Sequence, residues 1–189
     1  MCGLAVFLLL PCAPASAAEV AGVQVAERAQ IGLDGPKLVL NGAGLRTRFV
    51  FKVYVAALYL PVKVTSGEEI LRADLPRRLV LHILRALTAK ELTDSMNEAL
   101  AETLSPAERA PIDSRVQQFH SVIEAVRHLR PGMQIAIDYV PKLGTNVVIN
   151  GVVEGNIAGV DFNQALLRVW IGNHPRDVEL RTALLGTGP

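Results

Sequence analysis

The sequence predicts an α+β fold, in which helices are gathered on one side of an antiparallel sheet. Three observations support this prediction. Segments rich in valine, phenylalanine and tyrosine are separated by turn residues, as in antiparallel strands. Two capping boxes, which begin at Thr88 and Ser105, each precede apolar residues at helical spacing. A chain of 189 residues without a repeat or an interdomain linker is typical of one domain with a substantial core.

The N-terminus has the pattern of a secretory signal peptide. An apolar block at 4–10 is too short to cross a bilayer, and the small residues at 15–17 form a cleavage pattern. We therefore predict a signal peptide at 1–17, a mature domain at 18–189 and a periplasmic or secreted location. A membrane anchor is the alternative interpretation of the apolar block, whereas no stable membrane span is expected in the mature chain.

Both cysteines, Cys2 and Cys12, lie in the predicted signal peptide, so the mature chain is expected to contain no cysteine. A disulfide framework, a thiol nucleophile and a cysteine-ligated metal site are thereby excluded from the mature domain. The absence of thiols suits an oxidising compartment. The formal net charge of +1 gives no electrostatic reason to expect nucleic acid as a partner.

The first half of the chain is predicted to form strands and one short helix. The longest strand is expected at 48–61, after Gly42 and Gly44, which permit either a tight turn or a close backbone approach. Shorter strands are expected at 20–25, 37–40 and 77–87, and a short helix at 65–72.

The second half is predicted to begin with two amphipathic helices. One starts at Thr88, and the other starts at Ser105 and continues to a stop at 130–132. A further helix is expected to be capped by Asp161 and to end at Gly172. The remaining elements are strands at 134–140, 146–149 and 152–154, with a hairpin turn at Asn150-Gly151, and a last helix at 176–185.

Alternation along the long strand gives its two faces different characters. One face is apolar enough for a core, and the other mixes cations, a phenol and aliphatic groups, as in a strand that lines a cavity or a wet surface. The first face contains Phe49, Phe51, Val53, Val55, Ala57 and Tyr59, and the second contains Arg48, Val50, Lys52, Tyr54, Ala56, Leu58 and Leu60.

Arg46 is expected where the long strand begins, and it is a candidate for binding an anion. Its guanidinium is a permanent planar cation that suits a carboxylate, a phenolate or an enolate. Tyr54 on the same strand adds a neutral hydroxyl. The alternative is structural: Arg46 pairs with a carboxylate of the protein, and Tyr54 belongs partly to the core.

The sequence lacks several familiar site motifs. Gly42 and Gly44 are not followed by the third glycine or the helix of a dinucleotide-binding motif, and the chain has no P-loop. It also lacks the glycine-flanked serine of a nucleophile elbow. The four histidines show no ligand spacing with carboxylates. We therefore predict neither a metal site nor a cofactor.

Several segments resemble the bacterial chalcone isomerase-like proteins. They are Leu-Asn-Gly-Ala-Gly-Leu-Arg at 40–46, the strand at 53–60, and the helix at 161–172 followed by Leu-Leu-Gly at 184–186. The resemblance covers nearly all of the mature chain. It implies the chalcone isomerase fold, a large antiparallel sheet with a layer of helices packed on one face and a ligand cleft between them.

In the plant enzymes of this family, the arginine that Arg46 matches stabilises an anionic oxygen while a phenolate adds across an enone to close a ring. The resemblance places the plant threonine at about Tyr54, and the catalytic tyrosine among Ile83 and Leu84, where this chain has none. The plant asparagine has no clear equivalent, and the late serine or threonine falls near Gly159. Loss of these groups argues against stabilisation of a ring-closing transition state.

The same fold includes non-catalytic relatives that bind fatty acids through an arginine and a tyrosine. Arg46 with Tyr54 or Tyr59 fits that use. The resemblance therefore implies an exported binder of an apolar anionic small molecule, fatty acid-like or haem-like. The alternatives are an isomerase (intramolecular lyase) acting on a chalcone-type enone through Arg46, and a protein that modulates a partner through its surface. Ligand identity, enzyme activity and oligomeric state are left open.

Overall fold

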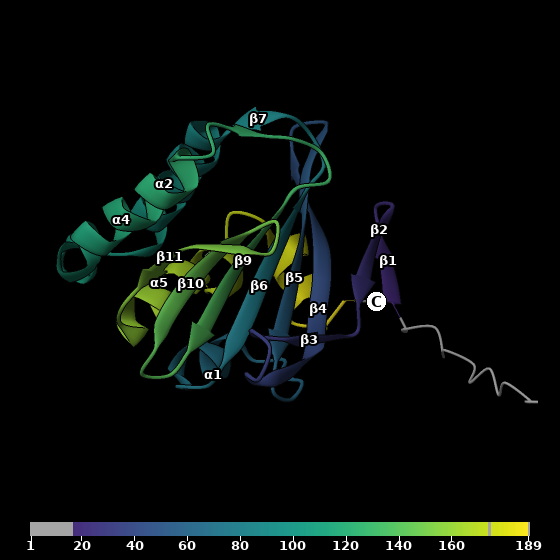
Figure 1. Cartoon of the computed structure of the whole chain (residues 1–189), viewed down its shortest axis with the longest axis horizontal. Coiled ribbons are helices and arrows are strands. Elements are labelled where there is room, and N and C mark those ends of the chain that lie inside the picture. The colour runs from purple at the N-terminus through teal and green to yellow at the C-terminus, as the bar shows by residue number, and fades with distance from the viewer. Residues whose placement is uncertain (1–16, 174, 189) are drawn as a thin grey trace, which may run out of the picture.

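The computed structural model describes residues 17–173 and 175–188 and has the predicted α+β architecture (Figure 1). Its strands are β1 (Ala17–Val20), β2 (Val23–Ala26), β3 (Arg28–Gln30), β4 (Lys37–Arg48), β5 (Phe51–Leu60), β6 (Arg77–Ile83), β7 (Leu87–Thr88), β8 (His128–Leu129), β9 (Gln134–Val140), β10 (Gly144–Ile149) and β11 (Val152–Ile157). Its helices are α1 (Gly67–Arg72), α2 (Ala89–Thr103), α3 (Pro106–Arg109), α4 (Asp113–Glu124), α5 (Val160–Ile171) and α6 (Val178–Leu184), with a 3₁₀ turn η1 (Ala110–Ile112) before α4.

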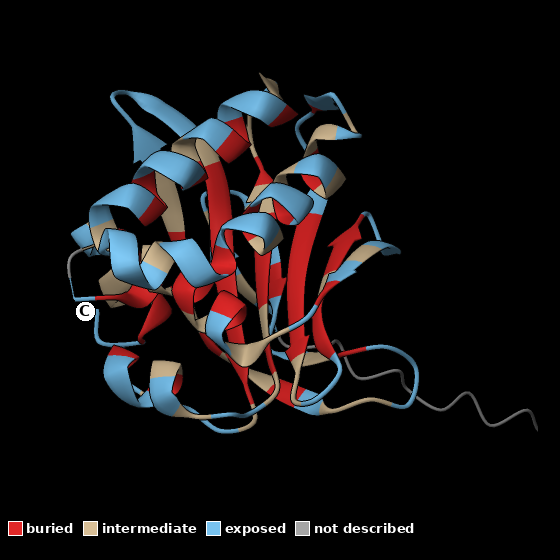
Figure 2. Ribbon diagram, turned by 90° about the vertical axis from the view of Figure 1, so that its left-hand side faces the viewer, coloured by how far each residue is buried: buried red, intermediate tan, exposed pale blue. Residues whose placement is uncertain are grey.

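The sheet contains seven strands in the order β11-β10-β9-β6-β5-β4-β3, and each neighbouring pair is antiparallel. The hairpin of β1 and β2 and the short pair of β7 and β8 are separate from it. The larger helices lie on one face of the sheet (Figures 1 and 2). This is the large antiparallel sheet with one helical layer that the sequence predicted. The predicted signal peptide falls almost entirely at 1–16, outside the described residues, as do Cys2 and Cys12.

The core has two parts, one on each face of the sheet. The part between sheet and helices contains Tyr54, Ala56, Leu58 and Leu60 of β5, and the part on the opposite face contains Val55, Ala57 and Tyr59. Figure 2 shows the buried strands beneath helices whose outer surfaces are exposed. Burial of each large apolar side chain contributes about 1.5–3 kcal/mol to the free energy of unfolding. Because alternate residues of β5 belong to different parts of the core, the predicted alternation is confirmed over the central part of this strand.

The long strand predicted at 48–61 is in fact the second arm of a hairpin. The chain is already extended in β4, and the turn at 49–50 connects β4 to β5. Gly42 and Gly44 lie inside β4, where α6 packs against them. A Cβ at Gly42 would come within 2.0 Å of the Ala183 carbonyl oxygen. Of the two interpretations of the glycines, the structure shows the close backbone approach.

Three apolar residues at the hairpin end differ from the predicted alternation. Phe49 and Phe51, which were assigned to the core face, are 89% and 56% exposed because they lie at or beside the turn. Arg46 pairs with Tyr54 and Thr47 pairs with Lys52, which leaves Val53 unpaired in a β-bulge. The bulge turns Val53 toward the helices, where it packs on the same part of the core as Tyr54.

Both predicted capping boxes are present. At Thr88, the hydroxyl accepts from the Glu91 amide at 3.1 Å, and the Glu91 carboxylate accepts from the Thr88 amide at 2.6 Å. The box at Ser105 opens only the short helix α3, because Pro111 follows it and a proline cannot continue the helical hydrogen bonding. The predicted stop at 130–132 is also too late. The chain leaves α4 after Glu124 and forms β8.

Other elements follow the sequence more closely, apart from one cap. Strand β9 and the turn at Asn150-Gly151 are as predicted. Helix α5 begins after Gly159, whose φ is 98°, and Asp161 lies in its first turn, where it binds Arg115 at 2.6 Å instead of capping the helix. None of the helices in 17–173 and 175–188 is both long and apolar enough to cross a membrane.

Candidate functional site

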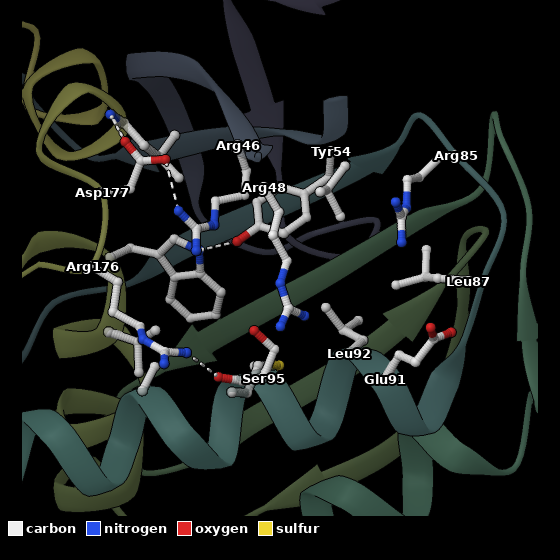
Figure 3. Close-up of a pocket in the computed structure, with 16 residues that line it drawn as sticks. Arg46, Arg48, Tyr54, Arg85, Leu87, Glu91, Leu92, Ser95, Arg176 and Asp177 are labelled. Atoms are coloured by element: carbon white, nitrogen blue, oxygen red, sulfur yellow. Dashed lines mark hydrogen bonds and ion pairs between the residues drawn. The ribbon is translucent and has the colours of Figure 1, made fainter. Parts of the chain in front are cut away.

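A pocket opens between the sheet, helix α2 and the segment that leads into α6 (Figure 3). Its volume is about 80 Å³. One part of the wall is apolar and the other is rich in arginine. The apolar residues are Val53, Leu87, Leu92, Met96, Ala99, Val169, Trp170 and Leu180, and the polar ones are Arg46, Arg48, Tyr54, Arg85, Glu91, Ser95, Arg176 and Asp177.

The structure brings Arg46 and Tyr54 together at this pocket. They are direct partners in the register of β4 and β5, so their side chains lie on the same face of the sheet. Arg46 lies near the end of β4, rather than at the start of a strand as predicted. Figure 3 shows both side chains reaching from the sheet toward the side of the pocket formed by α2.

Arg46 is held in place by Asp177. Its Nη1 lies 2.9 Å from Asp177 Oδ2, while Asp177 Oδ1 accepts from the Leu180 amide at 2.9 Å and so caps α6. The structural alternative for Arg46 is therefore present, because it pairs with a carboxylate of the protein. Within the described residues, however, the other guanidinium nitrogens of Arg46 have no partner, and its side chain is 20% exposed. These nitrogens are available to a second anion.

Tyr54 has a buried hydroxyl that retains a free proton. Its oxygen accepts from Trp170 Nε1 of α5 at 3.0 Å. Burial raises the pKa of Tyr54 above its usual value of 10.0, so the phenol stays protonated at neutral pH. Among the residues that the structure describes, none accepts the Tyr54 proton. The hydroxyl can therefore donate to a group that enters the pocket.

Three further arginines surround the pocket, and two of them are not neutralised. Arg176 is held by α2, with its Nε 2.6 Å from Glu102 Oε2. Arg48 and Arg85 form no ion pair with any residue of 17–173 or 175–188. Hydrogen bonds from Thr88 lower the pKa of Glu91, with smaller contributions from these two cations. The pocket therefore has an excess of positive charge, which favours an anionic ligand.

Tyr59 does not join Arg46 and Tyr54. It lies on the opposite face of the sheet, and its hydroxyl donates to the Ala26 carbonyl of β2 at 3.0 Å. Tyr54 and Tyr59 are five positions apart on one strand, and an odd spacing places side chains on opposite faces. Alternation in the sequence had already placed the two tyrosines on opposite faces, and the structure confirms that placement.

The positions that correspond to catalytic groups of the plant enzymes are apolar or distant. Ile83 is the register partner of Tyr54 on β6 and is buried. Leu84 packs against the part of the core on the other face of the sheet. Gly159 begins α5 beside Arg115 and does not line the pocket. The residues at the position that the resemblance assigns to the plant tyrosine are therefore aliphatic and do not line the pocket.

Sequence reasoning missed several residues of the pocket. Trp170, Asp177 and Arg176 come from the C-terminal part of the chain, and Arg85 from the segment after β6. Their sequence positions lie far from Arg46, and no motif connects them. The sequence offered no signal for them, because the arginines that meet at the pocket are spread along the chain from position 46 to position 176.

The histidines do not form a metal site in the described part of the chain, where no group of three potential ligands lies close enough to hold an ion. His82 and His120 are partly buried, and burial lowers the pKa of each. His174 lies outside the described residues.

Comparison with known proteins adds independent information. A family model described as chalcone isomerase-like matches residues 17–186. The comparison with curated protein sequences found no match. The crystal structure of a fatty-acid binding protein from Arabidopsis thaliana is similar, with a TM-score of 0.64 and 18% sequence identity over 84% of this chain and 96% of that one. At this identity the structural match establishes the fold alone, whereas the family model covers most of the sequence. The chain therefore belongs to the chalcone isomerase-like family.

Proposed function

We propose that this protein is an exported, non-catalytic binder of an apolar small molecule with an anionic group, acting in the periplasm or after secretion. The observation that carries this proposal is the pairing of Arg46 with Tyr54 at a pocket. Both side chains keep hydrogen-bond donors that no described residue uses. The apolar wall continues from these donors along α2 and α5.

A carboxylate suits the donors that these residues offer. One of its oxygens can accept from the free nitrogens of Arg46 and the other from the Tyr54 hydroxyl, and hydrogen bonds that involve an ion are about twice as strong as neutral ones. Asp177 orients the guanidinium, and Trp170 orients the phenol oxygen. Because both donors are already fixed, little side-chain freedom is lost when the ligand binds.

The size of the pocket favours a fatty acid-like ligand over a haem-like one. Its volume of about 80 Å³ is small beside the roughly 300–1,000 Å³ of typical small-molecule sites. A single alkyl chain enters a narrow opening more readily than a planar macrocycle. Met96 lies in the wall, and its flexible side chain can adapt to such a chain. The part of the ligand's alkyl chain that does not fit must extend along the pocket opening or displace α2.

The similar Arabidopsis structure gives additional support, because that protein is named a fatty-acid binding protein. The two chains share a fold, and in this chain the sheet and helices form the pocket beside Arg46. Tyr59, which the sequence analysis included, is left out of the proposed site because its hydroxyl is engaged on the opposite face.

The experiment is displacement of a fluorescent fatty acid by palmitate, with two pairs of matched variants. Tyr54→Phe is compared with Tyr59→Phe, which removes the same hydroxyl from the other face of the sheet. Arg46→Gln is compared with Arg115→Gln, which removes a surface arginine that pairs with Asp161. Loss of a hydrogen bond to a charged group costs about 1.5–3 kcal/mol.

We expect palmitate affinity to fall roughly tenfold in Tyr54→Phe and at least tenfold in Arg46→Gln, with little change in either control. Equal affinities in a site variant and its control would contradict the proposed site. If no fatty acid binds, turnover of a chalcone-type enone is the next assay. Cyclisation above the spontaneous rate that disappears in Arg46→Gln would favour the isomerase alternative.

Export needs its own test, because it rests on the pattern at 1–17. We expect cell fractionation to find the protein outside the cytoplasm and N-terminal analysis to find a chain that begins at Ala18. A full-length chain that stays with the cytoplasmic fraction would overturn this part of the proposal.

A further inference from the structure

The turn between β4 and β5 exposes large apolar side chains to solvent. Phe49 is 89% exposed, Val50 84% and Phe51 56%. They follow one another in sequence and form the tip of a two-residue hairpin, at the end of the sheet near β7 (Figure 1). Single exposed apolar residues are common on protein surfaces, but three adjacent ones on a projecting turn form a convex apolar surface. We call these three residues the hairpin tip.

The backbone of the hairpin tip is also unusual. Phe49 has a φ of 55°, in the left-handed region where an L-residue with a large side chain is disfavoured. Two-residue hairpin turns place glycine or asparagine at such positions. This chain does so elsewhere, at Asn150 and Gly151 between β10 and β11. At position 49 it carries instead a phenylalanine that contributes almost nothing to the core, so folding stability does not explain the residue.

Cations surround the hairpin tip. Arg48 and Lys52 flank it in sequence, and both are exposed. The guanidinium of Arg85 lies over the ring of Phe51, with Cζ 5.4 Å from the ring centroid. Glu91 is the nearby carboxylate of the pocket wall, and it is engaged by Thr88. This end of the molecule therefore combines an apolar surface with a local excess of positive charge.

We propose that the hairpin tip docks onto the surface of an anionic lipid bilayer. The phenylalanine rings and Val50 enter the boundary between headgroups and acyl chains, while Arg48, Lys52 and Arg85 contact lipid phosphates. This inference goes beyond the proposed ligand site and does not depend on it. The two features are nevertheless adjacent, because Arg48 and Arg85 also line the pocket. Docking would bring the pocket opening to the lipid surface.

The shape and chemistry of the hairpin tip favour a bilayer over a protein partner. A protein interface needs a complementary concave surface, whereas a convex tip can enter a fluid headgroup layer without one. Interfacial membrane-binding segments combine apolar residues such as phenylalanine on one side with long basic side chains on the other. Each cation near an anionic surface contributes about 1 kcal/mol, which corresponds to roughly fivefold in binding.

The test is co-sedimentation of the mature protein with vesicles of mixed phosphatidylcholine and phosphatidylglycerol. Vesicles of phosphatidylcholine alone serve as the uncharged comparison. The tip variant is Phe49→Gly with Phe51→Ser, and the charge variant is Lys52→Gln. The matched controls are Leu143→Ser and Lys142→Gln, which change an apolar and a basic residue in the turn at the opposite end of the sheet.

We expect binding to the anionic vesicles to fall at least tenfold in the tip variant and about fivefold in Lys52→Gln. Both controls should bind like the unchanged protein, and added salt should weaken binding by screening. The proposal is overturned if the unchanged protein does not bind anionic vesicles, or if the tip variant binds as well as Leu143→Ser. A protein partner on this surface would then become the better explanation.

The single variant Phe49→Gly distinguishes an effect on vesicle binding from an effect on folding stability. Because glycine adopts a positive φ without strain, we expect this variant to unfold at higher urea concentration than the unchanged protein and yet to bind vesicles less well. Phe49 and Phe51 do not line the pocket. Their variants should therefore keep palmitate affinity in solution, so failure of docking and failure of the proposed ligand site give different results.

Discussion

The two ends of the sheet each place an arginine beside a tyrosine of the neighbouring strand, but the two pairs do different things. At one end Arg46 lies opposite Tyr54, and at the other Arg77 lies opposite Tyr139. The guanidinium of Arg77 stacks on the Tyr139 ring, with Cζ 4.8 Å from its centroid. Arg77 is only 3% exposed, and burial lowers its pKa to about 10.

The difference lies in the acceptors around each guanidinium. Arg77 donates to Asn163 at 2.6 Å and to the carbonyls of Ile70 and Ala73 at 2.8 and 3.0 Å, so most of its donors serve the fold. Among the described residues Arg46 has one acceptor, Asp177, and it has a pocket beside it. The same pair of residue types is therefore structural where described residues engage all the guanidinium nitrogens except the buried Nη2 of Arg77, and it is available for binding where most of the donors are free.

The largest expected effect is loss of stability when Arg77 is replaced by methionine. The variant leaves two buried acceptors and one partly buried acceptor without this donor. Each unsatisfied group costs about 1–3 kcal/mol, so we expect a loss of at least about 3 kcal/mol. Urea unfolding followed by circular dichroism measures it. Arg46→Gln should lose less than about 1 kcal/mol, because its ion pair is partly exposed. Similar losses in both variants would break the proposed distinction.

The second prediction concerns the contact that brings α6 and Asp177 to the pocket. In Gly42→Val the new side chain would collide with the Ala183 carbonyl, which a Cβ would approach to 2.0 Å. Overpacking of this kind costs about 1–3 kcal/mol. We expect a loss of about 2 kcal/mol in urea unfolding, together with weaker palmitate binding. Ala43→Val, on the opposite face of β4, is the control, and an equal loss there would contradict the explanation.

The third prediction tests whether Asp177, the acceptor beside Arg46, competes with a bound carboxylate. Asparagine caps helices as well as aspartate does, so Asp177→Asn should preserve α6 while removing the negative charge that competes with a bound carboxylate. We expect palmitate to bind about fivefold more tightly, equivalent to roughly 1 kcal/mol. Titration calorimetry measures the change. Unchanged binding with intact thermal stability would show that Arg46 does not contact the ligand anion, whereas weaker binding would show that orientation of Arg46 by Asp177 outweighs the competition.

The smallest expected effect is on the alkaline side of the stability profile. Burial raises the pKa of Tyr54, and it raises the pKa of Tyr139 to about 12. Above about pH 10 the unfolded chain releases phenolic protons that the folded protein retains. The contribution of these phenols to the free energy of unfolding is therefore fully present below about pH 10 and is lost as the pH rises further. We expect Tyr54→Phe to reduce the loss of unfolding free energy between about pH 9 and about pH 11, which lie on either side of the reference pKa of roughly 10. Urea unfolding at the two pH values measures it. An unchanged slope would contradict the assigned burial of the phenol.

Much of the fold could be predicted because it depends on local preferences. The capping boxes at Thr88 and Ser105, the turn at Asn150-Gly151 and the alternation on β5 all act between near neighbours in sequence. Where the predictions were wrong, a local signal was overridden by a contact from elsewhere. Asp161, for example, binds Arg115 of α4 instead of capping α5. For the β4 glycines the sequence left two interpretations open, and the contact with α6 selects the close backbone approach.

For the site, the sequence by itself determined which residue types were available. It supplied an arginine and a tyrosine on strands, and its alternation already placed Tyr54 and Tyr59 on opposite faces. Only the tertiary structure decided which donors remained free. That depends on Asp177 and Trp170, which lie more than a hundred residues from Arg46 and Tyr54 in the chain and satisfy part, but not all, of their hydrogen-bonding capacity. Free donors are a property of the packed surroundings, because each donor is free only if no distant residue has reached it.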